Sequence, residues 1–414
     1  MQFLEKLHHP EKYWKLLLKW SLLGALMGGI GGLLGAGFHH VLHFVTEIRE
    51  HHTWLICLLP VAGLLSVGLY HLFRIPGNRG TNEVIEAVLK EEKLNGAIAP
   101  VIFLATSITH LFGGSAGREG AALQLGSSVA SKLGTVLKLN QQERKVLTMA
   151  GMSAVFAGLF GTPLTATFFC LEFLSVGTIF TPALLPCYLA AFMASRVSAS
   201  LGVHAETFLL AETVPFTFTV NWQVLVLSVL VGVLGIAMCL LFHEAEHFAA
   251  KKLPNPWVRI VLGGVVILGL TLLVGDHRYN GAGMAMALKA VAGEADWFDF
   301  LMKMLFTAVT LSAGFKGGEI VPTFCVGATF GCLLGGLLGL DPGFAAALGL
   351  VGLFCSVTNA PLASIMLSIE MFGSANMHLF AFVCVIAFVI SGNWSLYHSQ
   401  VMQFSKSRLV KRDK

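Results

Sequence analysis

Charged residues are scarce in this sequence: Asp, Glu, Lys and Arg together make up only 12% of 414 residues. Three long segments, residues 20–46, 213–243 and 371–405, contain none of them. A surface in contact with water needs many more charges, and 55% of the residues are hydrophobic, so a soluble enzyme is excluded. Each uncharged segment is long enough to cross the roughly 30 Å hydrocarbon core of a bilayer. We therefore expect a multi-pass membrane protein.

Signatures of bound cofactors are also lacking. The eight cysteines include no Cys-x-x-Cys pair, and most lie inside apolar segments, which indicates small core residues rather than disulfides or metal ligands. The adjacent histidines at 8–9, 39–40 and 51–52 point to different faces of a helix and make poor metal sites. No Walker sequence or nucleotide fingerprint is present. We expect no cofactor and no metal.

The net charge of +4 is small and concentrated near the ends of the chain, which argues against nucleic acid as a partner. Four lysines precede the first long apolar segment: Lys6, Lys12, Lys15 and Lys19. Five basic residues follow the last one: Lys406, Arg408, Lys411, Arg412 and Lys414. This bias predicts that both termini are cytoplasmic and that the number of crossings is even. The basic N-terminal stretch is expected to form an interfacial amphipathic helix rather than a signal peptide.

Apolar segments of full spanning length are predicted near residues 15–46, 53–73, 223–246, 257–274 and 376–395. The other apolar segments are shorter and broken by glycine or proline. These breaks fall at Gly113–Gly120, Gly161–Pro163, Gly281–Gly283, Gly314–Pro322 and Asn359–Pro361. Non-helical backbone at membrane depth is tolerated only where it is buried in protein or lines a wet cavity. Half-helices that point into a common interior, as in a channel or transporter, are therefore expected.

An internal repeat supports this interpretation. The segment Gly114-Ser-Ala-Gly-Arg-Glu119 recurs 200 residues later as Gly314-Phe-Lys-Gly-Gly-Glu319. A Pro-Leu pair followed by a glutamate nine residues after the proline also occurs twice, ending at Glu172 and at Glu370. Two matches in the same order divide the chain into halves at 1–205 and 206–414, with no separate soluble domain. Interrupted segments in matching positions of two halves indicate a substrate site at their interface near the middle of the membrane.

The glycines from Gly113 to Gly120 stand immediately before an apolar, helix-forming stretch. Unpaired N–H groups and the positive end of the helix dipole at such a helix start stabilise an anion. Glu119 falls in the first turn, where its carboxylate could occupy the same amides and leave them when protonated. The alternative is an ordinary capping carboxylate. Inside a membrane, however, a buried charge usually marks an ion pathway.

At these residues the sequence resembles the CLC family of anion channels and anion/proton antiporters, over nearly the whole chain. Gly117-Arg118-Glu119-Gly120 is similar to the family's gating-glutamate motif. Gly318-Glu319-Ile320-Val321-Pro322 stands where the family has Gly-x-Phe-x-Pro, and Tyr397 where it has a pore tyrosine near the C-terminus. The resemblance implies an all-α fold of two inverted halves with many broken or re-entrant helices. It also implies a homodimer with one pathway in each subunit.

Two departures from the chloride-type pattern point to a subclass. The segment Asn78-Arg79-Gly80-Thr81-Asn82-Glu83 replaces the serine motif of chloride-selective members. A glutamate in the position of Glu319 resembles the fluoride-exporting branch. Fluoride is strongly hydrated and needs closely placed donors, and a protonated Glu319 would be such a donor. Alternatively, Glu319 caps a helix or pairs with Lys316.

Other departures concern threonine and the inner proton glutamate. The threonine of the branch's Gly-Glu-Val-Thr-Pro is replaced by Val321, so its hydroxyl is absent or supplied by Thr323. Phe173 occupies the position of the intracellular proton glutamate in chloride/proton exchangers, and Glu172 is interpreted as a helix-end residue. For Tyr397 the alternative is an interfacial aromatic anchor. For Thr81 and Asn82 it is capping of the helix that follows.

The sequence therefore predicts an antiporter in the bacterial plasma membrane that exports fluoride in exchange for protons. The alternatives are a chloride/proton antiporter or a passive anion channel of the same fold, and a structural scaffold would not need two buried glutamates. Glu119 is predicted to be the gating, proton-exchanging glutamate and Glu319 the second glutamate of the pathway. The predicted substrate contacts are Gly80, Thr81, Asn82, Gly117, Arg118, Gly120, Gly318, Ile320, Val321 and Tyr397. Arg118 is expected to pair with a neighbouring carboxylate or reach an aqueous vestibule.

Overall fold

The first predicted span is one continuous helix in the computed structural model, α2 (Pro10–His51). It includes the basic residues Lys12, Lys15 and Lys19, so the basic stretch continues without a break into the first span. Lys19 forms an ion pair with Glu143, which holds this part of α2 against α7. The structure describes residues 10–75, 80–208, 214, 217–406 and 408–411. Lys6, Asn78, Arg79, Arg412 and Lys414 lie outside the described residues.

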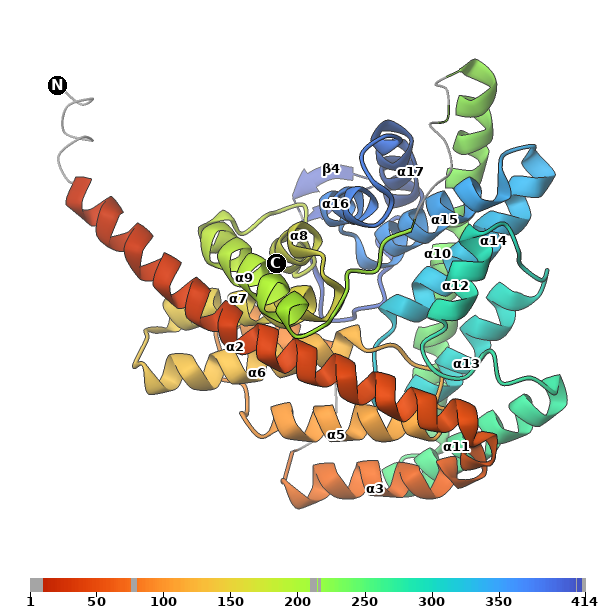
Figure 1. The fold of residues 1–414 in the computed structure, drawn as a ribbon, viewed down its shortest axis with the longest axis horizontal. Helices are drawn as coiled ribbons and strands as arrows, with labels where there is room; N and C mark the ends of the chain where they lie inside the picture. Colours follow the sequence, from red (N-terminus) through yellow and green to blue (C-terminus); the bar gives the residue numbers. More distant parts are fainter. Residues whose placement is uncertain (1–9, 76–79, 209–213, 215–216, 407, 412–414) are drawn as a thin grey trace.

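Helices account for most of the described chain (Figure 1). After α2 come η1 (Thr53–Leu58), α3 (Leu59–Leu72), α4 (Thr81–Leu89), α5 (Ile98–Leu111), α6 (Glu119–Val136), α7 (Gln141–Phe160), α8 (Pro163–Glu172), η2 (Thr181–Ala183) and α9 (Leu184–Ser200). Then follow α10 (Phe218–Lys252), α11 (Pro256–Val274), α12 (Met284–Val291), α13 (Asp299–Ala313), α14 (Ile320–Leu338), α15 (Pro342–Thr358), α16 (Pro361–Phe372) and α17 (Met377–Ile390).

Most of the predicted spans correspond to helices. The spans predicted at 53–73, 223–246 and 257–274 are η1 with α3, α10 and α11, and α17 is shorter than its predicted span. Two further segments, Thr181–Ser200 and Ile320–Leu338, are also long and apolar enough to cross a membrane. They were not predicted as spans because glycine, proline and hydroxyl residues break up their apolar pattern.

All five predicted breaks lie at turns between helices or in the first turn of a helix. At two of these breaks the backbone has the same conformation. Helix α7 ends at Gly161 with φ +71° and α8 begins at Pro163, while α15 ends at Asn359 with φ +57° and α16 begins at Pro361. A left-handed residue terminates a helix and proline starts the next one without losing a hydrogen bond. The repeat in the sequence is therefore repeated in the backbone.

Glycines allow the closest helix crossings. A Cβ atom at Gly126 would lie 2.1 Å from the carbonyl oxygen of Gly151, where α6 crosses α7. At the crossing of α14 and α15, a Cβ atom at Gly327 would lie 2.4 Å from the carbonyl oxygen of Gly349. In α2, a Cβ atom at Gly31 would lie 2.5 Å from Cβ of Ala154, so this glycine allows close packing against α7.

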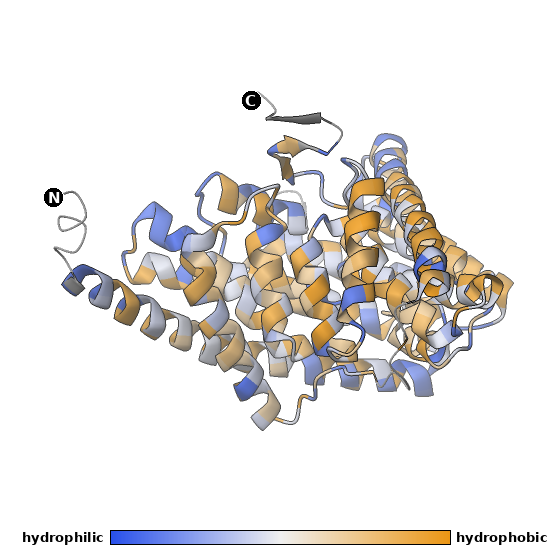
Figure 2. Ribbon diagram, turned by 90° about the horizontal axis from the view of Figure 1, so that it is seen from above, coloured by the Kyte–Doolittle hydropathy of each residue, from blue (hydrophilic) through white to orange (hydrophobic). Residues whose placement is uncertain are grey.

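Large apolar side chains remain exposed along the outer helices, including Leu33 of α2, Val61 of α3, Val233 of α10 and Leu273 of α11. Figure 2 shows hydrophobic residues along most of the helices, with hydrophilic residues gathered at several helix ends. Such extensive apolar surface is incompatible with water and matches the hydrocarbon of a bilayer.

Four short strands, which the sequence did not predict, hold the segment after α17. Strand β1 (Ser175–Val176) pairs in parallel with β2 (Val401–Met402), and β3 (Phe404–Ser405) pairs antiparallel with β4 (Arg408–Lys411). Just before β2, the Gln400 amide donates to the carbonyl oxygens of Phe173 at 2.6 Å and Thr358 at 2.9 Å. These bonds fix the segment that contains Tyr397 against the ends of α8 and α15.

Candidate functional site

The two matching glycine segments meet at the centre of the site. Gly117 N–H donates to the carbonyl oxygen of Gly318 at 2.7 Å, and Gly318 N–H donates back to Gly117 at 2.9 Å. A Cβ atom at Gly318 would lie only 2.6 Å from the nitrogen of Gly120, so a larger residue would push the segments apart. This antiparallel contact brings the first turns of α6 and α14 together.

Glu119 is the first residue of α6, and its side chain is fully buried. Its Oε2 accepts a hydrogen bond of 3.2 Å from Val321 N–H at the start of α14. Oε1 has no hydrogen-bond partner among the described residues. This carboxylate therefore binds an amide of the other half of the chain, which an ordinary cap of its own helix does not require.

Glu319 immediately precedes α14 and does not cap it with its side chain. Its Oε2 is buried without a hydrogen-bond partner among the described residues. Within that part of the chain no ion pair joins Glu319 to Lys316, whose ammonium lies 4.7 Å from the ring centroid of Tyr70. Both alternatives for Glu319, capping and a salt bridge, are therefore wrong. The hydroxyl of Thr323 donates to the backbone oxygen of Glu319 at 2.8 Å, so it is already occupied.

Tyr397 reaches the same region from the C-terminal segment. Its side chain is 2% exposed and its hydroxyl has no hydrogen-bond partner among the described residues. The hydroxyl lies within Coulombic range of Glu119 and Glu319. Because the ring is buried and packs edge-on against Phe173 at 5.8 Å, the interfacial-anchor alternative is wrong.

The start of α4 completes the cluster of helix N-termini. Gly80 is the N-cap with φ +57°, so neither Thr81 nor Asn82 holds the N-cap position that the capping alternative gave them. Thr81 lies against Gly120, where a Cβ atom would be 2.8 Å from its hydroxyl oxygen. Asn82 turns away and its Oδ1 accepts from Ser399 N–H at 3.0 Å.

The remaining predicted residues separate into lining and outward-facing groups. Ile320 and Val321 are buried in the first turn of α14. Arg118 points elsewhere: it pairs with Glu206, as the prediction of a neighbouring carboxylate requires, and approaches Nδ1 of His39 at 3.3 Å. Its guanidinium also lies 5.0 Å from the ring centroid of Phe160.

The second pair of matching glutamates forms reciprocal caps. Glu172 accepts hydrogen bonds from the amides of Leu362 at 3.2 Å and Ala363 at 3.0 Å, at the start of α16. Glu370 accepts from the amides of Leu164 and Thr165, both at 2.8 Å, at the start of α8. Glu172 is a helix-end residue, as predicted, but it caps a helix of the other half rather than its own.

A buried lysine near the site was missed in the sequence. Lys303 of α13 is fully buried, and its ammonium donates to Ser115 Oγ at 2.9 Å and to the carbonyl oxygens of Tyr279 at 3.1 Å and Gly281 at 2.7 Å. It therefore holds the glycine segment before α6 against the loop before α12. A lysine inside an apolar segment was the available signal, because charges at membrane depth are rarely without function.

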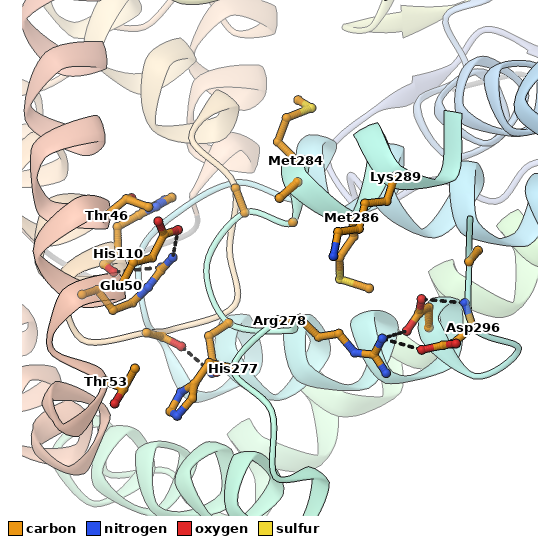
Figure 3. A pocket seen from close by; sticks show the side chains of 18 of the residues that line it. Thr46, Glu50, Thr53, His110, His277, Arg278, Met284, Met286, Lys289 and Asp296 are labelled. Atoms are coloured by element: carbon orange, nitrogen blue, oxygen red, sulfur yellow. Dashed lines mark hydrogen bonds and ion pairs between the residues drawn. The ribbon is translucent and has the colours of Figure 1, made fainter. Parts of the chain in front are cut away.

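A cavity of about 790 Å³ lies beside this segment and reaches Gly113 and His110. His110 Nε2 is 3.2 Å from the carbonyl oxygen of Gly117, so the cavity wall contacts the central glycine bridge. Figure 3 shows Arg278 directed toward Asp296 within this cavity. Glu119, Glu319 and Tyr397 do not line it. The cavity is a wide approach to the glycine segment rather than the place where the buried oxygens meet.

Comparisons with known proteins agree with this arrangement. The family model described as voltage gated chloride channel matches residues 62–392. The chain is 35% identical over 413 residues to the chloride/fluoride channel protein of Pseudomonas syringae pv. tomato, covering 97% of this chain and 91% of that protein. It is 26% identical to the voltage-gated ClC-type chloride channel ClcB of Escherichia coli O157:H7, covering 93% and 99%.

Solved structures show the same fold. The crystal structure of a CLC-type fluoride/proton antiporter superposes with a TM-score of 0.90 at 35% identity, covering 93% of this chain and 98% of that one. A slow cyanobacterial Cl⁻/H⁺ antiporter superposes with a TM-score of 0.76 at 21% identity, covering 90% and 94%. The family match spans most of the sequence and includes both glycine segments. The chain therefore belongs to the voltage-gated chloride channel family, the CLC family.

Proposed function

We propose that this protein is a fluoride/proton antiporter that exports fluoride in exchange for proton entry. One observation carries the proposal: Glu119 holds an α14 amide through one oxygen, while its other oxygen meets no hydrogen-bond partner in the described part of the chain, and a second glutamate, Glu319, is buried in the same region. Two buried carboxylates without a cation between them are costly as a purely structural element. The same pair is suited to exchanging an anion for protons.

Competition for one site couples the two movements. Ionised Glu119 accepts from Val321 N–H and thereby occupies the start of α14. Protonation removes the charge, so the carboxyl group can leave and expose that amide to an anion. When the anion leaves, Glu119 loses its proton and returns. An anion and a proton thus alternate at the same place, as antiport requires.

The surrounding donors favour fluoride over chloride. A small, strongly hydrated anion needs several strong donors to replace its water shell. The amide of Val321 and the hydroxyl of Tyr397 are such donors, and protonated Glu319 adds a third. Ionised Glu319 would instead repel any anion, so its protonation is tied to anion occupancy. The two similar proteins at 35% identity, a chloride/fluoride channel protein and a CLC-type fluoride/proton antiporter, support the same substrate.

The protein is further proposed to lie in the bacterial plasma membrane with both termini in the cytoplasm. The halves 1–205 and 206–414 are proposed to have opposite orientations. The reciprocal contacts between matching residues, Gly117 with Gly318 and the caps made by Glu172 and Glu370, support such an arrangement. A homodimer with one pathway in each subunit is part of the same proposal.

Ion flux from liposomes that contain the purified protein tests the function. Fluoride or chloride release is recorded with an ion-selective electrode, and proton movement is recorded in the same vesicles. We expect a fluoride gradient to drive protons uphill and chloride to move much more slowly. Equal chloride flux would indicate a chloride/proton antiporter, and fluoride flux without uphill proton movement would indicate a passive channel.

A further inference from the structure

Proton movement between Glu319 and the Lys19 end of the helices needs groups that can accept protons, and the end of α8 does not supply them. Phe173 is fully buried, and its ring stacks on Phe169 with centroids 4.5 Å apart. Glu172 beside it uses both oxygens to cap α16. The end of α8 beside Tyr397 is therefore packed with rings and a carboxylate that is already bound.

A cluster of titratable side chains lies next to Tyr397 along the chain. The ring of His398, the residue after Tyr397, lies 3.8 Å from the ring of His243 on α10, centroid to centroid. His398 Nε2 is 3.3 Å from Oε2 of Glu246, one turn further along α10. We call these three residues the α10 relay: His243, Glu246 and His398.

The α10 relay connects solvent with the buried site. The side chains of Glu246 and His398 are 64% and 49% exposed, whereas Nε2 of His243 is buried without a hydrogen-bond partner among the described residues. The carboxylate of Glu246 lies within Coulombic range of Glu319. One end of the cluster therefore exchanges protons with water, while the other end is buried against the residues that precede Tyr397.

The position of the cluster along α10 places it at the Lys19 end of the molecule. The chain before α10 contacts the far end of α2, where His40 Nε2 is 2.9 Å from the carbonyl oxygen of Leu201. Helix α10 starts after that connection and runs away from it for 35 residues, so Glu246 lies toward the opposite end. Under the proposed orientation this end is cytoplasmic.

We propose that His243, His398 and Glu246 form the inner proton relay of the antiporter, which carries protons between Glu319 and the cytoplasm. The proposal rests on the proposed fluoride/proton exchange and deepens it. In the export direction the O–H bond of protonated Glu319 breaks and an N–H bond forms on His243 through intervening water. The proton then passes to His398, to the carboxylate of Glu246 and finally to bulk water.

The geometry limits the relay to one proton at a time. Two imidazolium rings 3.8 Å apart would repel each other strongly, whereas one imidazolium beside Glu246 is stabilised. The other charged groups around the relay come from α4, α11 and the loop before α14: Glu83, Glu86, Arg259 and Lys316. Cations and carboxylates are mixed in this set, so the charge of the relay is set mainly by Glu246.

Chemical rescue tests the relay in the full-length protein reconstituted in liposomes. We expect His398→Ala to slow fluoride-driven proton movement about tenfold, less than the roughly 100- to 10,000-fold contribution of a general acid–base group, because Glu246 and water can still carry protons. Because this side chain is half exposed, added imidazole can reach the site and should restore the rate in a concentration-dependent manner. A residue with a merely structural role would not be rescued.

Matched controls lie on the same helix. Glu244→Gln and His247→Ala change exposed residues of the same types on α10 and should leave both the rate and the response to imidazole unchanged. Glu246→Gln should slow proton movement less than His398→Ala. An unchanged rate in the His243→Ala/His398→Ala double variant, or a slowed His398→Ala protein that imidazole does not restore, would overturn the relay. Lack of coupled flux in the unmodified protein would instead refute the proposed function.

Discussion

Two pairs of glutamates occupy matching positions in the halves of the chain and are used in opposite ways. Glu119 and Glu319 are 200 residues apart, and Glu172 and Glu370 are 198 apart. In the second pair each carboxylate accepts two backbone amides of the other half. In the first pair each glutamate keeps a buried oxygen without a hydrogen-bond partner in the described part of the chain.

The difference shows how the structure separates fixed charges from exchangeable ones. A carboxylate that accepts two amides is stabilised in its ionised form and held in one rotamer. A buried carboxylate with one unpaired oxygen loses fewer hydrogen bonds when it is protonated or when it moves away. The caps made by Glu172 and Glu370 therefore hold the two halves together, and Glu119 and Glu319 remain available for ion exchange.

The strongest way to break this comparison is to make Glu119 permanently neutral. In Glu119→Gln the side chain cannot alternate between an ionised form on the Val321 amide and a protonated form away from it. We expect fluoride-driven proton movement to fall by at least about a hundredfold. Any remaining fluoride flux should be insensitive to pH. Paired fluoride and pH recordings in liposomes measure both quantities.

Glu172→Gln is the matched control for this substitution, because it makes the same chemical change in the capping pair. It should keep the unmodified ratio of protons to fluoride. If Glu119→Gln still drives protons uphill at that ratio, Glu119 is not the exchanging group.

The second expected effect separates hydrogen-bond donation from titration at Glu319. Glu319→Ala removes both, and losing a hydrogen bond to a charged partner costs about 1.5–3 kcal/mol, or roughly 10- to 100-fold in turnover. Glu319→Gln keeps a donor of similar shape, so fluoride binding should partly survive while coupling weakens. Fluoride binding measured by calorimetry and turnover in liposomes distinguish the two variants. Normal transport by Glu319→Ala would mean that the residue is structural.

The fold and the central residues could be predicted largely from repeats and motifs. Offsets of 200 and 198 residues indicated which segments correspond, and the breaks at glycine and proline indicated where helices end. Whether a glutamate is free or bound could not be predicted. Glu119 and Glu172 both stand at a helix end, and only the packing of the other half decides how many amides each one meets.

Contacts that join distant segments could not be predicted from the sequence either. Lys303 meets Ser115 across 188 residues, and His243 meets His398 across 155, with no local pattern to link either pair. For Asn82 and Thr81, capping is the alternative to substrate contact, because the pattern before α4 resembles a helix start. Gly80 takes the N-cap position instead, which frees Asn82 to hold Ser399.

A third prediction concerns stability rather than transport. Glu370→Gln replaces a carboxylate that accepts from Leu164, Thr165 N–H and the Thr165 hydroxyl, and an amide can satisfy only part of that set. We expect a loss of about 1–3 kcal/mol in the free energy of unfolding. A lower melting temperature in detergent should therefore accompany a ratio of protons to fluoride that stays unchanged. A changed ratio of protons to fluoride with an unchanged melting temperature would mean that Glu370 takes part in ion exchange, and the two glutamate pairs would then not differ in function.

The smallest expected effect sharpens the comparison at Tyr397, whose hydroxyl, like the free oxygens of Glu119 and Glu319, has no hydrogen-bond partner among the described residues. Tyr397→Phe removes only this hydroxyl and keeps the edge-on contact with Phe173. Because no hydrogen bond is lost in the folded protein, the melting temperature should stay the same or rise slightly. If the hydroxyl donates to fluoride during transport, fluoride affinity should fall roughly threefold, as expected for one neutral hydrogen bond. Calorimetric titration with fluoride, with chloride as the control anion, measures this change. An unchanged fluoride affinity would remove Tyr397 from the pathway and leave only the two glutamates and the α14 amide as its contacts.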